Sequence, residues 1–292
     1  MAVGVSLPSP RALDRAIAEA TSHAGAEDTR DLPPPPKWRR IVVGVDGEPG
    51  SEAALAWAGR LAGPQGQVRA VCAALPPERH LPKGSGARDV LDVLGGRVED
   101  AAAILDEAQA YLAAQGVRCK AVQVEASPGS AILRQAIDWG ADLVALGSHR
   151  HSALERLQLG SVSDTVKHAT PCSVLVARSQ PPPRTVLAAV DGSVPSRLAA
   201  RAALQVAQQM DCAFVLHHAA GRRGSQPDGG VRVVTTTGPP AKGIVRAAKA
   251  ERADLVVVGS RGLGGIASLA LGSVSDRVTR KAPASILVVK GG

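Results

Sequence analysis

The chain has 292 residues, enough for two domains of roughly 100–150 residues each. A hydrophobic content of 45% with 21% charged residues is ordinary for a soluble globular protein. Aromatic residues make up only 2%, so the cores must be built from Ala, Val, Leu and Ile, which suits parallel sheets covered by Ala-rich helices.

The formal net charge of +8 raises the question of a nucleic acid partner. The basic residues are scattered along the chain, and no basic run is interleaved with the aromatic residues that stack on single strands. We therefore expect a solvated basic surface and no nucleic acid partner. Four cysteines without C-x-x-C spacing or a zinc-type cluster indicate a reducing cytoplasm and no metal site. No apolar run approaches the length of a membrane span, so we expect no membrane partner.

The N-terminal residues stand apart from the rest. Residues 1–37 are polar and include the prolines 33–36, so we expect a mostly disordered tail and a stiff Pro-rich linker, within which 11–20 could form a short helix. A first domain is expected at 38–179. Its predicted strands are 40–45, 68–75, 117–124, 143–146 and 173–177, and its predicted helices are 51–61, 97–114, 130–139 and 163–168.

A second run of prolines, 181–183, marks a short linker at 180–183 and a second domain at 184–292. This domain alternates in the same way. Its predicted strands are 185–190, 213–218, 231–236, 255–258 and 285–289, and its predicted helices are 196–210, 242–250 and 275–281. Strands that alternate with helices predict parallel sheets with right-handed crossovers.

The two domains are copies of each other. Residues 141–148 read ADLVALGS and residues 253–260 read ADLVVVGS, an offset of 112 that holds to Pro171 and Pro283. Val-Asp-Gly at 45–47 recurs at 190–192, an offset of 145. The second copy therefore lacks 33 residues, which correspond to the long helix of the first copy. We expect one face of its sheet to be less well covered, or to be shielded by the first copy.

Ligands of open parallel sheets bind beyond the carboxyl ends of the strands. After its fourth strand the second copy has Gly259 and Gly262 in a G-x-x-G, then nine residues, then Gly272-Ser273 leading into a helix. Glycines let backbone N–H groups approach phosphate oxygens, and a helix N-terminus adds unpaired donors and a positive dipole. This pattern favours a phosphate site, with a flexible turn as the alternative.

The spacing of these glycines, with the Val-Asp-Gly-Ser that ends the first strand of the second copy, resembles the nucleotide loop of the universal stress protein family. The resemblance covers about residues 39–290. It implies two tandem five-stranded, parallel-sheet, Rossmann-like domains of the adenine nucleotide α-hydrolase type, the second lacking one helix. The implied ligand is ATP, with or without Mg²⁺.

Site residues follow from this resemblance by position. Asp191 corresponds to the acidic residue near the ribose and base, and His217 and His218 lie in the region that contacts adenine. The residues that match the phosphate and ribose loop are Gly259, Gly262, Gly272, Ser273 and Val274, with Ser275 beside them. A turn cap at Asp191 and a structural role for each histidine remain alternatives.

The first copy departs from this pattern. Arg150 stands where the second glycine of G-x-x-G is expected, and its side chain would crowd the approach to phosphate. The retained positions are Asp46, Gly147, Gly160 and Ser161. The first copy is therefore either a degenerate nucleotide site or an anion site held by Arg150 and the histidines beside it.

No catalytic residue is indicated, because the chain has neither a G-x-x-x-x-G-K-S/T loop nor a G-x-S-x-G elbow. We expect a cytoplasmic ATP-binding regulatory protein of the stress response and not an enzyme. The alternatives are a protein interaction module that binds no nucleotide and, less favoured, a nucleotide-hydrolysing enzyme. Family dimers pair through their last strands, which implies that 173–177 and 285–289 pair within the chain as a pseudo-dimer and leaves a homodimer open.

Overall fold

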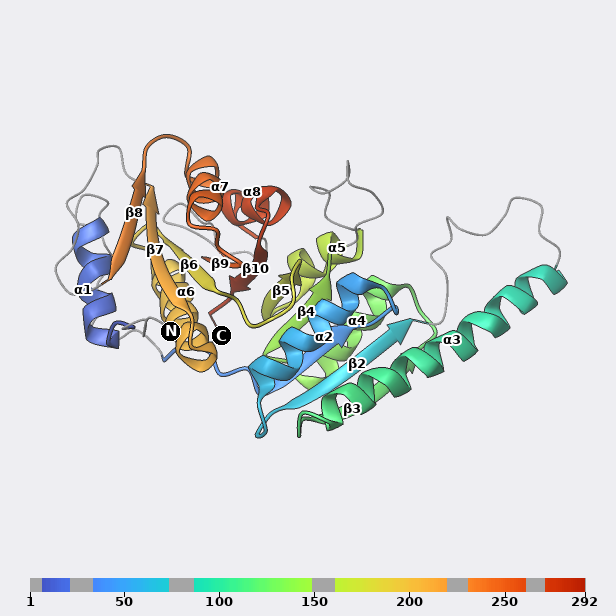
Figure 1. Cartoon of the computed structure of the whole chain (residues 1–292). Helices are drawn as coiled ribbons and strands as arrows, with labels where there is room; N and C mark the ends of the chain where they lie inside the picture. Colours follow the sequence, from blue (N-terminus) through green and yellow to red (C-terminus); the bar gives the residue numbers. More distant parts are fainter. Residues whose placement is uncertain are drawn as a thin grey trace.

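The computed structural model describes residues 7–21, 34–73, 87–148, 161–219, 231–260 and 271–291, and only the backbone of 87–99 and 161. In this part of the chain, strands alternate with helices in two successive domains (Figure 1). None of the helices in the described ranges is both long and apolar enough to cross a membrane.

Among its described residues, the first domain contains five strands and four helices in the predicted order. These are β1 (Arg40–Gly44), α2 (Pro49–Ala62), β2 (Gln67–Ala73), α3 (Ala87–Ala113), β3 (Arg118–Val124), α4 (Pro128–Trp139), β4 (Leu143–Gly147), α5 (Ser161–Ala169) and β5 (Ser173–Ala177). Helix α3 begins ten residues before its predicted start.

The part of the second domain that the structure describes repeats this order with one helix fewer. Its elements are β6 (Thr185–Val190), α6 (Val194–Met210), β7 (Ala213–Ala219), β8 (Arg232–Thr236), α7 (Pro240–Ala250), β9 (Leu255–Gly259), α8 (Ser273–Lys281) and β10 (Ser285–Val289). Only twelve residues join β7 to β8, where the first domain has room for the 27 residues of α3 between β2 and β3.

All ten strands form one sheet, with the order β3-β2-β1-β4-β5-β10-β9-β6-β7-β8. Neighbours within each domain are parallel, and the join between the domains is antiparallel, with Leu287 of β10 opposite Leu175 of β5. Both of these last strands are buried along their whole length. Each domain therefore covers the aliphatic edge strand that the other would expose.

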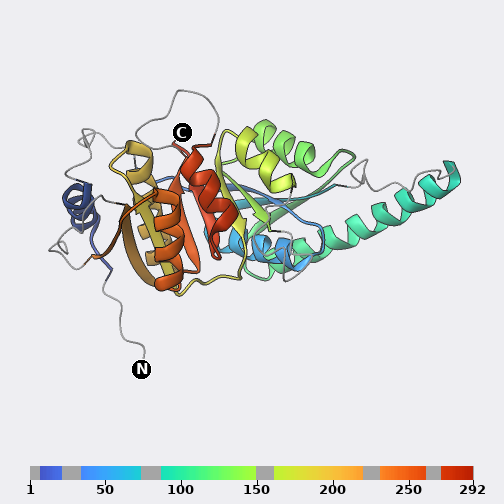
Figure 2. The same ribbon diagram turned by 90° about the horizontal axis from the view of Figure 1, so that it is seen from above.

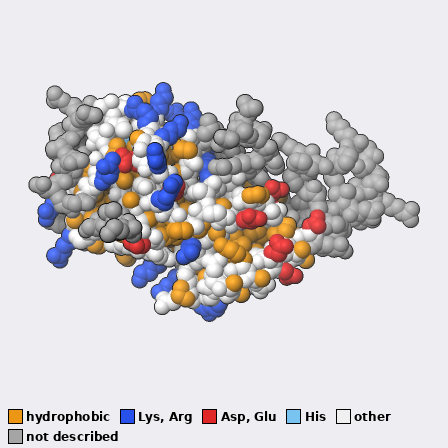
Figure 3. Space-filling view, in the orientation of Figure 1, with side chains coloured by type: hydrophobic (Ala, Val, Ile, Leu, Met, Phe, Trp, Pro, Cys, Tyr) orange, Lys and Arg blue, Asp and Glu red, His pale blue; other side chains and the backbone are white. Residues whose placement is uncertain are grey.

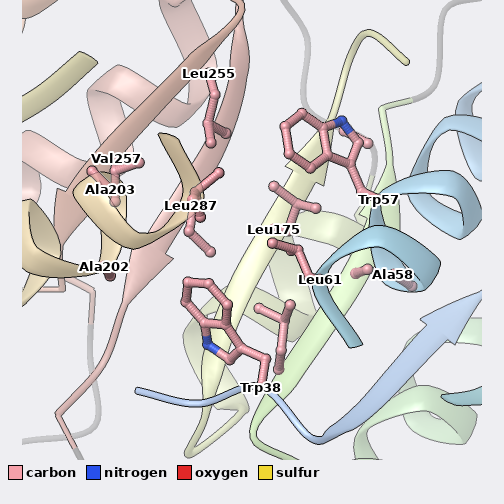
Figure 4. Close-up of a cluster of buried hydrophobic side chains, with 14 of the residues drawn as sticks. Trp38, Trp57, Ala58, Leu61, Leu175, Ala202, Ala203, Leu255, Val257 and Leu287 are labelled. Carbon is pink, nitrogen blue, oxygen red and sulfur yellow. The ribbon is translucent and has the colours of Figure 1, made fainter. Parts of the chain in front are cut away.

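The hydrophobic core on one face of the sheet is continuous between the domains. Trp57 and Leu175 of the first domain lie in one cluster with Leu255, Val257 and Leu287 of the second (Figure 4). All five side chains are completely buried. The two domains thus share a core as well as a sheet.

Polar bonds at the join are arranged with approximate two-fold symmetry. The backbone N–H of Arg178 donates to the hydroxyl of Ser285 (3.0 Å), and the N–H of Lys290, its counterpart, donates to that of Ser173 (3.2 Å). The Arg178 side chain donates to carbonyls at and after the end of α8, while the Lys290 side chain donates to carbonyls at and after the end of α5. Each basic side chain therefore satisfies carbonyl groups at the C-terminus of a helix in the other domain.

An ion-pair cluster lies beside this join. Lys167 is fully buried, and its ammonium group contacts Asp164 (2.7 Å) and also Asp276 of the second domain. Arg280 bonds to the same two carboxylates, at 2.7 Å and 3.1 Å. Burial alone would raise the pKa of each aspartate, but the bonds from Lys167 and Arg280 outweigh it and lower both pKa values. Asp164, His168 and Asp276 are close enough to hold a metal ion, but the two cations already neutralise both carboxylates.

The N-terminal residues contain a helix, α1 (Pro10–Thr21), which packs on the second domain against α6 and β7. Leu13, Ala16, Ile17 and Thr21 are completely buried there. The short helix allowed for at 11–20 therefore forms, as α1. The expectation of a mostly disordered tail does not hold for these residues, because their apolar side chains at helical spacing form one stripe against the domain. Residues 1–6 and 22–33 lie outside the described ranges.

Helix α1 takes the place of the helix that the second domain lacks. In the first domain α3 packs beside α2 on β2 and β3, and in the second domain α1 packs beside α6 on β7, the counterpart of β2. The two helices lie at opposite ends of the long sheet (Figures 1 and 2). The face expected to be uncovered, or shielded by the first copy, is instead covered by the N-terminal helix.

Candidate nucleotide site

The first loop of the site follows β6 and is organised by Asp191. The Oδ1 atom of Asp191 accepts the backbone N–H (3.1 Å) and the hydroxyl (2.6 Å) of Ser193. Ser193 is the N-cap of α6, and its hydroxyl accepts the N–H of Ser196 at 3.4 Å. Gly192 between them has φ +90°, a conformation that side chains disfavour. Asp191 thus holds the turn, and its role toward a ligand remains a prediction.

The equivalent loop of the first domain keeps the turn but not the hydroxyl. The N–H of Glu48 donates to Oδ1 of Asp46 at 3.1 Å, and Gly47 has φ +75°. Glu48 is the N-cap of α2, and its side chain makes no capping bond. The first domain therefore has an exposed carboxylate where the second has a buried hydroxyl.

The second loop follows β9 and touches the first. A Cβ atom added at Gly259 would lie 2.7 Å from the carbonyl carbon of Pro195, which is closer than real side chains allow. In the first domain, a Cβ atom at Gly147 would lie 2.3 Å from the carbonyl carbon of Gly50. These two glycines are thus required by the packing of one loop on the other, whether or not a phosphate binds.

Helix α8 begins beside these loops. Its N-cap is Gly272, which has no side chain to accept a bond, and the N–H of Gly272 donates to the carbonyl of Ser260 (2.7 Å). Ser275 is buried, and its hydroxyl donates to the carbonyl of Gly259 (2.5 Å). Ser273, at the first position of the helix, is exposed, and Val274 is half-buried. The Ser275 hydroxyl is therefore used to hold the loop to the helix. The Ser273 side chain makes no hydrogen bond to any other described residue.

Three of the candidate residues lie outside the described ranges. They are Gly262 of the second domain and Gly160 and Arg150 of the first, so the anion site expected at Arg150 and its neighbouring histidines is not placed. Ser161 is placed only as the first residue of α5. The structure therefore brings together Asp191, Gly259 and Ser273 with their immediate neighbours.

The two histidines of β7 lie on opposite faces of the sheet. The Nδ1–H of His218 donates to the carbonyl of Val190 (3.0 Å), the residue directly before Asp191. The bond fixes Nδ1 as the protonated nitrogen of a neutral ring, so Nε2 is the nitrogen that can accept a hydrogen bond. Nε2 of His217 bonds to the hydroxyl of Thr236 at 2.9 Å. Burial, with smaller contributions from the charges of His218 and Arg246, lowers the pKa of His217 to about 4. His218 is therefore the histidine that adjoins the first loop.

Two residues near Gly192 were not expected from the sequence. Arg197 is 2% exposed, and its Nε donates to the carbonyl of Gly192 at 3.1 Å. The side chain of Thr21, at the end of α1, lies 3.3 Å from the position that a Cβ atom of Gly192 would take. The N-terminal helix therefore packs directly against the candidate nucleotide loop. The apolar spacing at 11–20 predicts an amphipathic helix, but no sequence signal predicts which loop this helix contacts.

In each domain the loops after the first and fourth strands meet at the carboxyl ends of a parallel sheet, beside the N-terminus of a helix. This arrangement defines a Rossmann-like α/β domain, and the chain contains two of them. The model of the Universal stress protein family matches residues 37–178 and 219–290. The chain belongs to this family, and the duplication is a duplication of its domain.

Some similar proteins match both domains of this chain. Universal stress protein Rv2005c of Mycobacterium tuberculosis is 30% identical over 298 residues, which span 88% of this chain and 98% of that protein. The crystal structure of a universal stress protein from Archaeoglobus fulgidus covers 88% of this chain and all of its own, with a TM-score of 0.66 and 20% identity. A universal stress protein in complex with cAMP matches 49% of this chain, with 28% identity and a TM-score of 0.38.

Proposed function

We propose that the second domain binds an adenine nucleotide, ATP, as a regulatory ligand. The observation that carries this proposal is the position of the α8 N-terminus at the two touching loops of that domain. The first N–H groups of a helix have no partner within the helix, and the Gly272 cap supplies none from a side chain. The backbone of Ser273 and Val274 therefore offers unpaired donors, with the hydroxyl of Ser273 beside them, where a phosphate would lie.

Differences between the domains favour the second as the binding site. Glu48 adds a negative charge at the first loop of domain one, where Ser193 is neutral. In the sequence, Arg150 replaces the glycine that Gly262 supplies in domain two. A carboxylate repels phosphate, and a side chain at a glycine position obstructs close approach of the backbone. We therefore expect about one ATP per chain.

ATP is proposed as a ligand and not as a substrate. Asp191 is engaged in its turn, and His217 is buried with a lowered pKa, so neither supports a role as catalytic base in the second domain. The four cysteines are free thiols, which fits a cytoplasmic, reducing setting. The alternative function, a protein interaction module without nucleotide, would follow if the α8 N-terminus binds no phosphate.

Calorimetric titration with ATP and Mg²⁺ tests the proposal on the full chain. The informative variant is Ser273→Pro, which removes one N–H and one hydroxyl from the site. Proline is favoured at the first position of a helix, and Gly272 before it has φ −64° and ψ 150°, which a residue preceding proline prefers. The variant should fold normally and bind ATP about tenfold more weakly, as expected for loss of bonds to a charged group.

The matched control is Ser161→Pro, at the start of α5 in the first domain, which should leave ATP affinity unchanged. Gly262→Arg, which copies the first domain, should abolish binding. If the wild type binds no ATP at millimolar concentration, the interaction module is the better description. Rapid release of phosphate by the wild type would favour the enzyme instead.

A further inference from the structure

Two neighbouring helices of the second domain present a basic surface. Helices α7 and α8 pack side by side on the sheet, and Figure 3 shows Lys and Arg side chains gathered over them. We define the α7–α8 basic face by its five exposed cations: Lys242, Arg246, Lys249, Arg277 and Lys281. They come from two segments of sequence that are separated by β9, so the fold assembles a cluster that the sequence shows only as scattered charges.

These charges are not neutralised by neighbours. Among the described residues none of the five forms an ion pair, and Arg246 donates only to the carbonyl of Thr237 (2.7 Å). The only acidic residue within the two helices is Asp276, which is bonded to Lys167 and Arg280. Within the part of the chain that the structure describes, no acidic side chain compensates the positive potential of this face.

The duplication supplies an internal comparison. At the offset of 112 residues, the five cations correspond to positions on α4 and α5 of the first domain, where only one residue is basic. These positions are occupied by Ser130, Arg134, Ile137, Thr165 and Ala169. The same fold therefore does not require the charges, and their concentration in one copy is a property of that copy.

We propose that the α7–α8 basic face binds the phosphate backbone of duplex nucleic acid. No aromatic residue occurs on either helix, so base stacking with a single strand is not available. The exposed large hydrophobic side chains of the described residues, Tyr111 and Ile137, lie in the first domain, so this face has no apolar anchor for a lipid surface. A rigid row of cations suits a rigid row of phosphates.

The dimensions of the face set the expected affinity. Lys242 and Lys249 are separated by about 10 Å along α7, which is roughly the axial rise of three nucleotide steps of one strand. With α8 alongside, three to four phosphate contacts give a slope of about −3 in log K against log salt concentration. Binding should be independent of sequence, with a Kd of roughly 10⁻⁴ to 10⁻⁶ M at physiological salt. This proposal departs from the expectation of no nucleic acid partner and is independent of ATP binding.

Fluorescence anisotropy with a labelled 20-base-pair duplex tests this on the full chain. Lys242→Gln, Arg246→Gln and Lys249→Gln combined should weaken binding at least about tenfold at low salt and reduce the salt slope by about 2 to 3. The matched control combines Arg118→Gln, Lys120→Gln and Arg134→Gln, three exposed basic positions of the first domain. It removes the same net charge and should change the affinity less than about twofold.

Three results would overturn the proposal. The wild type could fail to bind the duplex at low salt, or both triple variants could lose affinity equally, in which case only net charge matters. Phosphatidylserine vesicles or polyglutamate could instead bind the wild type through the same three residues while the duplex does not, which would assign the face to a membrane or an acidic protein. Since all substituted side chains are exposed, an unchanged melting temperature shows that each variant is folded.

Discussion

Removal of residues 1–22 should expose the face of the second domain that α1 covers. The helix buries Leu13 and Ile17 completely against α6 and β7. It is also held by Arg201, whose guanidinium bonds to both carboxylate oxygens of Asp14 at 3.2 Å and 2.7 Å. The deletion therefore removes apolar contacts that no other described element supplies, and we expect the second domain to lose stability.

The magnitude follows from the buried side chains. Truncation of a fully buried Leu or Ile to Ala costs about 2–4 kcal/mol when the surroundings stay in place. Helix α1 can detach, however, so the total loss cannot exceed the free energy with which it docks. Leu13→Ala and Ile17→Ala should therefore be less than additive, and the double variant should match the deletion. A loss of about 3 kcal/mol corresponds to a melting temperature lower by roughly 6–10 °C. Asp14→Ala should cost less than about 1 kcal/mol, because both partners are partly exposed.

Thermal unfolding of the deletion and of the double variant measures this loss, and hydrogen exchange should locate it in α6 and β7. Arg15→Ala is the control, since Arg15 is exposed on the same helix and alanine retains helix propensity. A deletion variant with the same melting temperature and exchange protection as the wild type would refute the docking of α1.

Three further outcomes concern buried charges and protons. Lys167→Ala leaves Asp164 and Asp276 close together with Arg280 as their remaining cation. Urea unfolding should show that the free energy of unfolding falls by about 3–5 kcal/mol. A change below about 1 kcal/mol would show that the cluster is solvated and contributes little. The lowered pKa values of these aspartates mean that their stabilisation is present above the ordinary pKa of 3.8 and is lost as pH falls through the folded values, so Asp276→Asn should flatten the acid unfolding curve below about pH 4. The pKa of His217 falls from 6.5 to about 4, so the unfolded chain binds the proton more readily and stability should decrease from pH 6.5 to 4; His217→Asn should remove that part of the slope.

The alternation of elements could be predicted because each strand is an aliphatic run and each helix has apolar residues at helical spacing. The deficit of 33 residues in the second copy and the periodic residues near 11–20 were also visible in the sequence. The packing of α1 in place of the missing helix could not be predicted, because α1 and the second domain are separated in the sequence by the whole first domain. Contacts over such distances depend on tertiary packing and leave no local pattern.

The site shows a different limit. Gly259 was predicted from its spacing, and the structure places it at the expected loop, where contact with Pro195 already excludes a side chain. A glycine required by packing and a glycine required by a phosphate look the same in a sequence. Asp191 is similar, because an aspartate that holds a turn has the same spacing as one that faces a ribose. A ligand titration on variants of these two residues therefore tests the role of each toward a nucleotide.

Neither domain can bury its apolar surfaces with its own residues alone. Without β10, the first domain would expose β5, which is buried on both faces and paired at both edges in the full sheet. The second domain requires β5 in the same way and also requires α1, which precedes the first domain in the sequence. Residues 184–292 alone would therefore expose both an aliphatic edge strand and an apolar sheet face. The unit that folds cooperatively should then be the whole chain. Because α1 touches Gly192, the stability of the N-terminal helix and the geometry of the candidate nucleotide loop are parts of the same structural unit.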